Sequence, residues 1–292
     1  MKISTDCLPC ILKRVIFEAK LSTNNECTIE EVIRKVCREL SNLYDPKVCS
    51  AEIATRIHGV TYKILKDPDP YRNLKRRSNM IAKELLPIAE GLIEDSSDRL
   101  KTSMLISIIG NTLDFGIEGG SSDPENLANI FEQLIKEGLG YDDYDACKDL
   151  IRVARSIILF TDNCGEVVFD NLLCKELKRF NSNLCISLVV KGEPVLSDAT
   201  LDDIKGLSFE KYVDEILTTG SFAVGVDFRN IPRKVKNILD NVDVIICKGM
   251  ANYESFSETD YRPVIYLLRT KCRPIATSMG IPQGVNAIKL YK

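Results

Sequence analysis

The sequence predicts an α/β protein in which a helical N-terminal region precedes a series of βα units around a mostly parallel sheet. Residues 1 to about 150 carry apolar side chains at helical spacing, whereas short β-branched runs alternate with amphipathic helices from about residue 155 onward. Three of these runs end in polar side chains, which is typical of the ligand-binding edge of an open α/β sheet. We therefore divide the chain into a helical N-terminal domain (1–98), a helical connecting subdomain (99–153) and an α/β domain (154–292).

The N-terminal half shows successive helix signals. Apolar residues recur at helical spacing over 10–20, and a capping box formed by Thr28 and Glu31 is expected to open the next helix. Two prolines in 66–71 disfavour helical backbone before them, so this segment is predicted to be a loop. Further helices are expected over 50–65, 72–93, 99–113, 124–137 and 145–154.

The C-terminal half shows strand signals separated by helices. Its β-branched and apolar runs are four to seven residues long, as expected of buried strands in a parallel sheet. The predicted strands are 157–160, 184–190, 213–217, 242–246, 264–268 and 285–290. The clearest intervening helices are 166–179 and 229–239.

The composition is that of an ordinary globular protein, since 45% of the residues are hydrophobic and 28% are charged. The 39 basic and 42 acidic residues nearly balance and form no long basic block, which argues against nucleic acid or an anionic membrane as the main partner. A small anionic substrate is compatible with this charge if a metal ion or a few lysines receive it. The sequence has no apolar run of about 18 residues and no signal-peptide pattern, so we expect a cytoplasmic protein.

Histidine and cysteine usage restricts the chemistry. The single histidine, His58, excludes multi-histidine zinc sites, so acid, amide and lysine side chains must carry any catalysis. The eleven cysteines are expected to be mostly reduced core residues. Cys7 and Cys10 have the spacing of half a metal site or of a redox pair at a helix start, where the helix dipole favours a thiolate. A lone pair of this kind also occurs without either role.

Oxygen ligands follow two of the predicted strands. Asp162 and Asn163 come after the run 157–160, and Asp198 follows the run 184–190. Because the carboxyl ends of parallel strands meet at one edge of the sheet, these side chains are expected to form a site for Mg²⁺ or Mn²⁺. The alternative is that Asp162 and Asn163 cap the following helix and that Asp198 is a turn residue.

A cation follows a third strand. Lys248 comes after the run 242–246, where a lysine can bind phosphate and stabilise a phosphoryl-transfer transition state. Gly249 allows close approach of the backbone to a ligand. Asn252 and Glu254 lie within one helical turn and are expected to orient Lys248 or to bind substrate. Alternatively, Lys248 is a solvated residue at a strand end, and Asn252 and Glu254 cap a helix.

Asn111 and Asp114 share one face of a predicted helix, from which they can reach a cleft on the side of the helical half. Polar residues at a helix end are the alternative. The glycines over 116–120 match neither the dinucleotide fingerprint nor the P-loop, so they give little support for nucleotide binding.

The motifs resemble, in order and over almost the whole chain, those of the damage-control phosphatase family, most closely its stand-alone archaeal branch. The matching pieces are Cys7-x-x-Cys10, Asp69-Pro70-Tyr71 followed by Lys75, Gly110-Asn111-x-x-Asp114, Thr161-Asp162-Asn163-x-Gly165-Glu166, Lys191-Gly192-x-Pro194-Val195-x-x-Asp198-Ala199-Thr200 and Lys248-Gly249-x-x-Asn252-Tyr253-Glu254. One departure is Cys164, where a small residue such as alanine is expected.

The resemblance implies a Rossmann-like three-layer α/β/α C-terminal domain and a bound divalent metal ion (Mg²⁺, Mn²⁺, Co²⁺ or Ni²⁺). The implied metal ligands are Asp162, Asn163 and Asp198. The implied catalytic residues are Asp162, Glu166 and Lys248. The residues expected to contact a small phosphorylated metabolite are Asn111, Asp114, Asn252 and Glu254.

The function implied is hydrolysis of phosphate monoesters of small metabolites, including damaged or side-product sugar phosphates. Either a water molecule attacks directly, with Glu166 or Asp162 as base, or an aspartate forms a covalent phosphoenzyme. One alternative is an S-adenosylmethionine-dependent carboxyl methyltransferase, which the absence of a glycine-rich cofactor loop disfavours. Another is a non-enzymatic metal or thiol sensor acting through Cys7 and Cys10. The motifs specify no oligomeric state.

Overall fold

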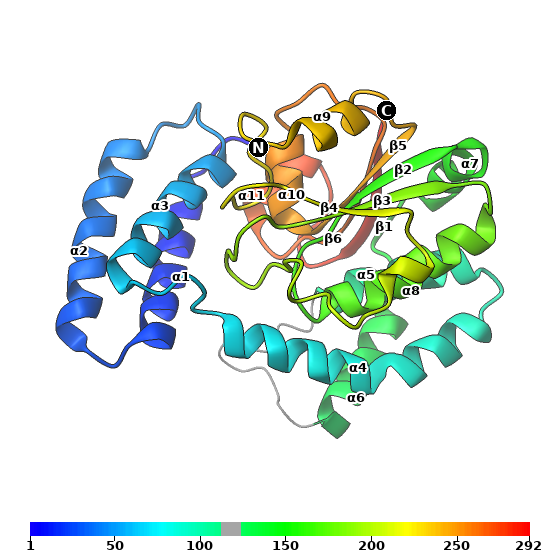
Figure 1. Ribbon diagram of the computed structural model, residues 1–292, viewed down its shortest axis with the longest axis horizontal. Helices are drawn as coiled ribbons and strands as arrows, with labels where there is room; N and C mark the ends of the chain where they lie inside the picture. Colours follow the sequence, from blue (N-terminus) through cyan, green and yellow to red (C-terminus); the bar gives the residue numbers. More distant parts are fainter. Residues whose placement is uncertain (112–123) are drawn as a thin grey trace.

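The computed structural model describes residues 1–111 and 124–292, and it confirms an α/β fold with a mostly parallel sheet. Three N-terminal helices stand beside the part of the molecule that contains the sheet (Figure 1). Asp114 and the end of the helix predicted over 99–113 lie outside the described residues.

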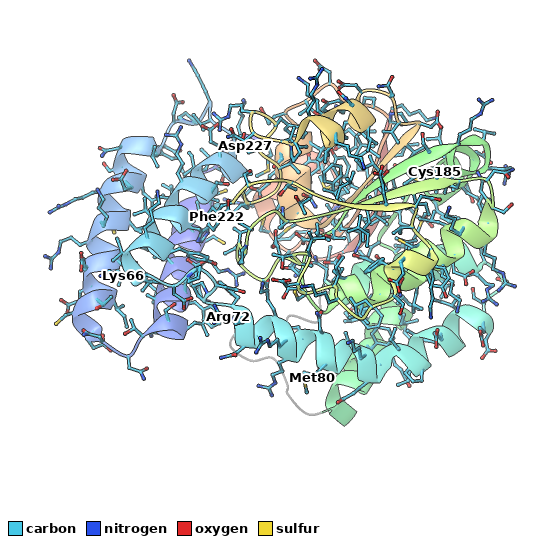
Figure 2. All side chains as sticks on the ribbon, viewed as in Figure 1. Lys66, Arg72, Met80, Cys185, Phe222 and Asp227 are labelled. Atoms are coloured by element: carbon cyan, nitrogen blue, oxygen red, sulfur yellow. The ribbon has the colours of Figure 1, made fainter. Side chains whose placement is uncertain are left out.

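The three-helix unit consists of α1 (Cys7–Ser22), α2 (Glu26–Leu43) and α3 (Ser50–Leu65). Their inward-facing apolar side chains form a hydrophobic cluster that also includes Val195 and Val224 from loops of the α/β part. Phe222 extends toward this unit (Figure 2), and its ring lies 5.3 Å from that of Tyr62 on α3. The unit therefore packs directly on loops that follow the sheet strands.

Seven strands of the described chain form one sheet, in the order β1-β7-β6-β5-β2-β3-β4. Neighbouring strands are parallel except for β6 and β7, which are antiparallel. The strands are β1 (Tyr141–Asp142), β2 (Ser156–Phe160), β3 (Cys185–Val190), β4 (Glu215–Thr218), β5 (Val244–Lys248), β6 (Val264–Arg269) and β7 (Asn286–Tyr291). Since β2 lies between β3 and β5, the carboxyl ends of these three strands are adjacent.

Helices cover both faces of the sheet, so this part has three layers. One face packs against α4 (Arg72–Glu94), α5 (Arg99–Gly110), α6 (Pro124–Glu137), α7 (Tyr144–Val153) and α8 (Glu166–Phe180). The other packs against α9 (Arg233–Leu239), α10 (Gly249–Phe256) and α11 (Arg273–Met279). A short 3₁₀ helix, η1 (Phe209–Lys211), precedes β4.

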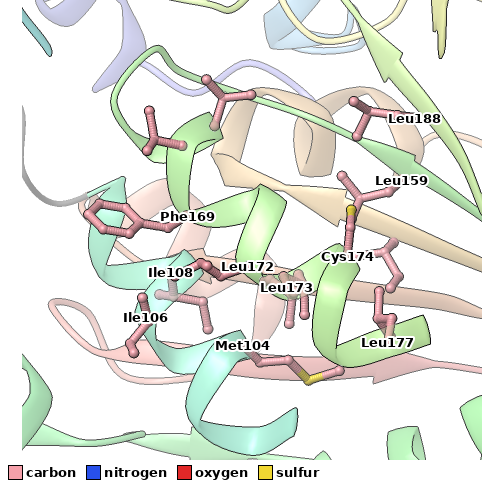
Figure 3. Close-up of a cluster of buried hydrophobic side chains, with 14 of the residues drawn as sticks. Met104, Ile106, Ile108, Leu159, Phe169, Leu172, Leu173, Cys174, Leu177 and Leu188 are labelled. Carbon is pink, nitrogen blue, oxygen red and sulfur yellow. The ribbon is translucent and has the colours of Figure 1, made fainter. Parts of the chain in front are cut away.

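Alternation along the strands determines which side chains meet which helices. Leu159 of β2 and Leu188 of β3 point to the face covered by α5 and α8 (Figure 3). Ile158 and Phe160, the intervening residues of β2, contribute to the cluster on the opposite face. Burial on both faces explains why these strands appear in the sequence as continuous apolar runs.

Several predicted boundaries were wrong. The second helix begins at Glu26, because the side chain of Asn25 accepts a hydrogen bond from the Thr28 amide and thereby caps the helix three residues before the expected cap, Thr28. The helix predicted over 229–239 begins only at Arg233, after Pro232, which has no amide hydrogen to donate. The strand predicted over 213–217 is Glu215–Thr218. Strand β1 and helices α10 and α11 were not predicted.

The proposed domain borders at residues 98 and 153 stay predictions. Buried side chains of α4 and α5 belong to the same hydrophobic cluster as α8 and the sheet. In the part of the chain that the structure describes, no helix is both long and apolar enough to span a lipid bilayer.

Candidate active site

Two loops at the carboxyl edge of the sheet are joined by their backbones. The first follows β2 and carries Asp162 and Asn163, and the second follows β3 and carries Asp198. Asn163 and Asp198 form an isolated antiparallel bridge, and the Ala199 amide donates to the Asp162 carbonyl at 2.8 Å. The Ser197 hydroxyl also donates to Oδ1 of Asn163 at 2.6 Å. The structure thus brings the three predicted metal ligands into adjacent, connected segments.

Asp162 is nearly buried, with 5% of its surface exposed, and amide donors surround its carboxylate. Oδ2 accepts hydrogen bonds from Nδ2 of Asn111 and from Nδ2 of Asn163, each at 2.7 Å. Burial raises the pKa of the Asp162 carboxyl to about 7, and the negative charge of Asp198 adds to the increase. The alternative role as a helix cap was wrong, because α8 has Gly165 at its N-cap position and no side-chain cap.

Gly249 allows Asp162 to lie against the start of α10. Its φ of +71° is in the left-handed region, and an added Cβ would lie 1.8 Å from Oδ2 of Asp162. Only glycine satisfies both the backbone conformation and this close approach. The sequence analysis expected Gly249 to give room for a ligand; in the structure it gives room for a site carboxylate.

Lys248 is fully buried in an ionic cluster, so the alternative of a solvated lysine was wrong. Its ammonium contacts the carboxylate of Glu166 and lies 3.0 Å from Oδ1 of Asp170, and it donates to the Ser107 carbonyl at 3.1 Å. Burial alone would lower the pKa of Lys248, but attraction to Asp170 and Glu166 raises it. Burial raises the pKa of the Glu166 carboxyl to about 8, against the opposing effect of Lys248.

Asn111 links the Asp162 and Glu166 carboxylates. It follows the last residue of α5, and its Nδ2 donates to Glu166 Oε2 as well as to Asp162. The exposed Lys271 donates to the Asn111 carbonyl, and its positive charge acts to lower the pKa of Asp162. A cation therefore lies at the surface next to the buried carboxylates.

A second buried lysine lies beside Asp198. The ammonium of Lys191 is 3.2 Å from Asp198 Oδ2 and donates to the Gly225 carbonyl. Among the described residues, Oδ2 of Asp198 is buried and has no partner in hydrogen-bonding geometry. Burial raises the pKa of the Asp198 carboxyl, although Lys191 opposes the increase. This oxygen therefore has Lys191 as an ion-pair partner and lies in the predicted metal site.

The described cluster has more acidic than basic side chains. Four buried carboxylates face two buried ammonium groups, and the raised pKa values of Asp162 and Glu166 mean that not all four carboxylates are ionised near neutral pH in the metal-free protein. The carboxylates are Asp162, Glu166, Asp170 and Asp198, and the ammonium groups are Lys191 and Lys248. One divalent cation would balance the two carboxylates in excess once all four are ionised, and carboxylate and amide oxygens are the ligands that Mg²⁺ and Mn²⁺ prefer. Among the described residues, no three His, Cys, Asp or Glu side chains are arranged as a ready metal site; the predicted donor set has two carboxylates, Asp162 and Asp198, and the amide oxygen of Asn163.

Two predicted substrate residues differ in their surroundings, because Asn252 lies at the ends of the site strands and Glu254 contacts α3. Asn252 is buried and its Nδ2 donates to the carbonyls of Thr161 and Lys248, so it joins the ends of β2 and β5. Glu254 accepts a 2.6 Å hydrogen bond from Ser50 on α3, and burial raises the pKa of its carboxyl. None of its described contacts is with the cluster around Asp162.

Cys7 and Cys10 are free thiols in the first turn of α1, the former half-buried and the latter exposed. We expected the helix start to favour a thiolate, but burial raises the pKa of Cys7 and makes the thiolate less favourable. Cys272 also lies within electrostatic range of both, and burial is the main cause of its raised pKa.

Asp170 and Ser107 were not predicted as site residues, and Lys191 was given no role. Ser107 Oγ donates to Asp170 Oδ1 at 2.6 Å, so both groups support the Lys248 ammonium. A sequence signal was present for Asp170, which is four residues after Glu166 and therefore on the same face of a helix. Lys191 directly follows β3 and has the strand-end position that identified the other site residues.

Comparisons with known proteins agree over the whole chain. A family model described as the damage-control phosphatase ARMT1-like domain matches residues 3–286. The chain is 38% identical to a protein of Archaeoglobus fulgidus named damage-control phosphatase, over 292 residues and 100% of both chains. It is 27% identical to a damage-control phosphatase of Pyrococcus horikoshii, over 97% of this chain and 96% of that protein. The crystal structure of a DUF89 family protein from P. horikoshii superposes with a TM-score of 0.91 at 26% identity, covering 100% of both chains.

Proposed function

The chain belongs to the ARMT1-like damage-control phosphatase family, and we propose that it is a divalent-metal-dependent phosphatase acting on phosphate monoesters of small metabolites. The names of its relatives support damaged or side-product metabolites as substrates, and sugar phosphates fit this class.

One observation supports the metal dependence most strongly. The buried cluster at the carboxyl edge of the sheet has two more carboxylates than ammonium groups. Buried charges without partners are strongly unfavourable, so a site of this composition is suited to a divalent cation. Asp162, Asn163 and Asp198 would hold the ion, since they lie on the two connected loops and carry carboxylate and amide oxygens.

The chain's own residues supply positioning, charge and proton transfer. When bound, the ion acts as a Lewis acid toward the phosphoryl group. Lys248, held between Glu166 and Asp170, provides positive charge beside the carboxylates, and Lys271 provides an exposed cation that suits an anionic substrate. Asn111 fixes the carboxylates of Asp162 and Glu166 relative to each other. The proposed proton acceptor for an attacking water is the carboxylate of Asp162 or of Glu166.

The experiment is phosphate release from a panel of small phosphate monoesters, after chelation and re-addition of Mg²⁺, Mn²⁺, Co²⁺ or Ni²⁺. Wild type is compared with Asp162→Ala and with Asp145→Ala, which removes an exposed carboxylate on α7. We expect metal-dependent turnover in wild type and Asp145→Ala and its loss in Asp162→Ala. Trapping a phosphoaspartate would identify the covalent route and exclude direct attack by water.

The two alternative functions give different results. Absence of turnover with every metal, together with binding of S-adenosylmethionine in calorimetry without added metal, would favour methyl transfer. A sensor acting through its thiols would lose its response in a Cys7→Ser/Cys10→Ser double variant, whereas the phosphatase is expected to keep its turnover.

A further inference from the structure

Helix α4 reaches the active site from the opposite side to α10. It begins at Arg72, next to the three-helix unit (Figure 2), and its first two turns approach the loops that follow β2 and β3. Lys75 and Asn79 are four residues apart and therefore lie on the same face of this helix. Lys75 is 1% exposed although it carries a charge.

Lys75 holds the segment that follows Asp198. Its ammonium lies 2.9 Å from Oδ2 of Asp203 and 3.0 Å from Oδ2 of Asp69. The same Asp203 oxygen accepts hydrogen bonds from the Thr200 amide at 2.9 Å and from the Thr200 hydroxyl at 2.7 Å. The position of Thr200, two residues after Asp198, is therefore fixed through Asp203 to α4.

Asn79 contacts both loops with one amide group. Its Oδ1 accepts a 2.7 Å hydrogen bond from the Gly165 amide, and its Nδ2 donates to the Asp203 carbonyl at 2.8 Å. Gly165 lies between Asn163 and Glu166 and has a φ of +85°, so it sets the direction in which the chain leaves the β2 loop and enters α8. A shift of Asn79 would move the two loops relative to each other.

We propose that Lys75 and Asn79 are positioning residues that hold the loops after β2 and β3 at the separation needed for cation binding, an inference that rests on the proposed function. Neither side chain has a described hydrogen bond or ion pair with Asp162, Asn163 or the carboxylate of Asp198, and both reach the two loops through Gly165, Thr200 and Asp203. In metal sites, outer partners of this kind typically change metal affinity or activity by roughly 10- to 100-fold when they are removed.

The first test uses Asn79→Ala, with Asn73→Ala as the matched control, because Asn73 is exposed on the same helix. Mn²⁺ affinity is measured by calorimetry, and phosphate release is measured as a function of Mn²⁺ concentration. Asn79→Ala is expected to weaken Mn²⁺ binding roughly 10- to 100-fold and to raise the Mn²⁺ concentration for half-maximal activity by the same factor. A merely destabilising substitution would lower activity without moving this concentration.

Hydrogen exchange in the metal-free protein gives a second readout. The amide of Gly165 is expected to exchange at least about tenfold faster in Asn79→Ala, because its acceptor is removed, but not in Asn73→Ala. For Lys75, the double variant Lys75→Met/Asp69→Asn keeps the net charge unchanged and is expected to speed exchange at Thr200. Lys83→Met, an exposed lysine of the same helix, is its control.

The outcomes separate the two proposals. Unchanged Mn²⁺ affinity in Asn79→Ala, or unchanged exchange at Gly165, would overturn the positioning role while the proposed function stands. If wild-type protein binds no divalent cation, the proposed function is refuted. The exchange rates of Gly165 and Thr200 in the metal-free variants would then be the only test of whether Asn79 and Lys75 position the loops.

Discussion

Substitution of Gly249 by alanine is expected to damage the active site far more than the fold. The added Cβ would lie 1.8 Å from Oδ2 and 2.3 Å from Cγ of Asp162, and Cβ contacts below 3.0 Å essentially never occur. The Asp162 carboxylate must therefore move by at least 1.2 Å. Misplacement of a catalytic group by about 1 Å can lower the rate by about 100-fold.

Gly280→Ala is a matched control for the backbone contribution. Gly280 has a φ of +67°, close to the +71° of Gly249, but an added Cβ would have no neighbour within 4 Å. Left-handed backbone disfavours an L-residue by about 1–2 kcal/mol, and both variants should lose about this much stability in urea unfolding. Only Gly249→Ala carries the additional displacement of Asp162.

The assay compares phosphate release and Mn²⁺ affinity in the two variants and in wild type. Gly249→Ala is expected to show about 100-fold lower turnover and weaker Mn²⁺ binding, whereas Gly280→Ala stays near wild type. If Gly249→Ala retained turnover within about threefold of Gly280→Ala, Asp162 would not need its observed position, and its assignment to the site would be refuted.

Three further predictions concern the charge of the cluster. Lys248→Met leaves Glu166 and Asp170 buried without their cation, so the free energy of unfolding measured by urea titration should fall by about 3–5 kcal/mol. The control variant Lys236→Met, which changes an exposed lysine, should have a free energy of unfolding near that of wild type. Addition of Mn²⁺ at 100 times its dissociation constant should raise the free energy of unfolding of wild type by about 2.7 kcal/mol, seen as a higher melting temperature that a chelator reverses. Asp162→Asn removes one buried carboxylate, so the free energy of unfolding of the metal-free protein should rise by about 1 kcal/mol, while phosphate release is lost. A lower free energy of unfolding in this variant would contradict the view that the buried carboxylates repel one another.

The sequence predicted the central strands well because their burial leaves a clear pattern. Strands β2, β3, β5 and β6 are covered on both faces and therefore appear as continuous apolar runs. The two-residue β1 pairs only with β7 at the sheet edge and has no such run. Strand order was not predictable, because it depends on contacts between segments that are far apart in the chain. The sequence separates β2 from β5 by more than 80 residues, but they pair directly.

Site residues were predictable where a strand end presents them and not where a helix does. Asp162, Asp198 and Lys248 stand out because each interrupts an apolar pattern at the carboxyl edge. Ser107 lies within the almost fully buried helix α5, and Asn79 lies within the amphipathic helix α4, where a polar residue normally faces solvent. Only the packing of α5 and α4 against α8 and its preceding loop directs them inward. Glu254 was predicted at the site because it lies close to Lys248 in the sequence, but its described side-chain hydrogen bond is with Ser50 on α3.

The arrangement of charge in this site explains why so many elements support it. The excess of buried carboxylates opposes folding of the metal-free chain, since mutual repulsion and lost hydration are only partly offset by Lys191 and Lys248. The loops after β2 and β3 offset part of this cost by bonding to each other, since the Ala199 amide donates to the Asp162 carbonyl and the Cys164 amide donates to the Ser197 carbonyl. Helices add further support: Asn111 after α5 donates to Asp162, Asn79 on α4 bonds to Gly165 and Asp203, and Gly249 at the start of α10 leaves room for the Asp162 carboxylate. A cation that binds between the loops would then stabilise the folded chain and complete the site in the same step, which couples stability to function in this protein.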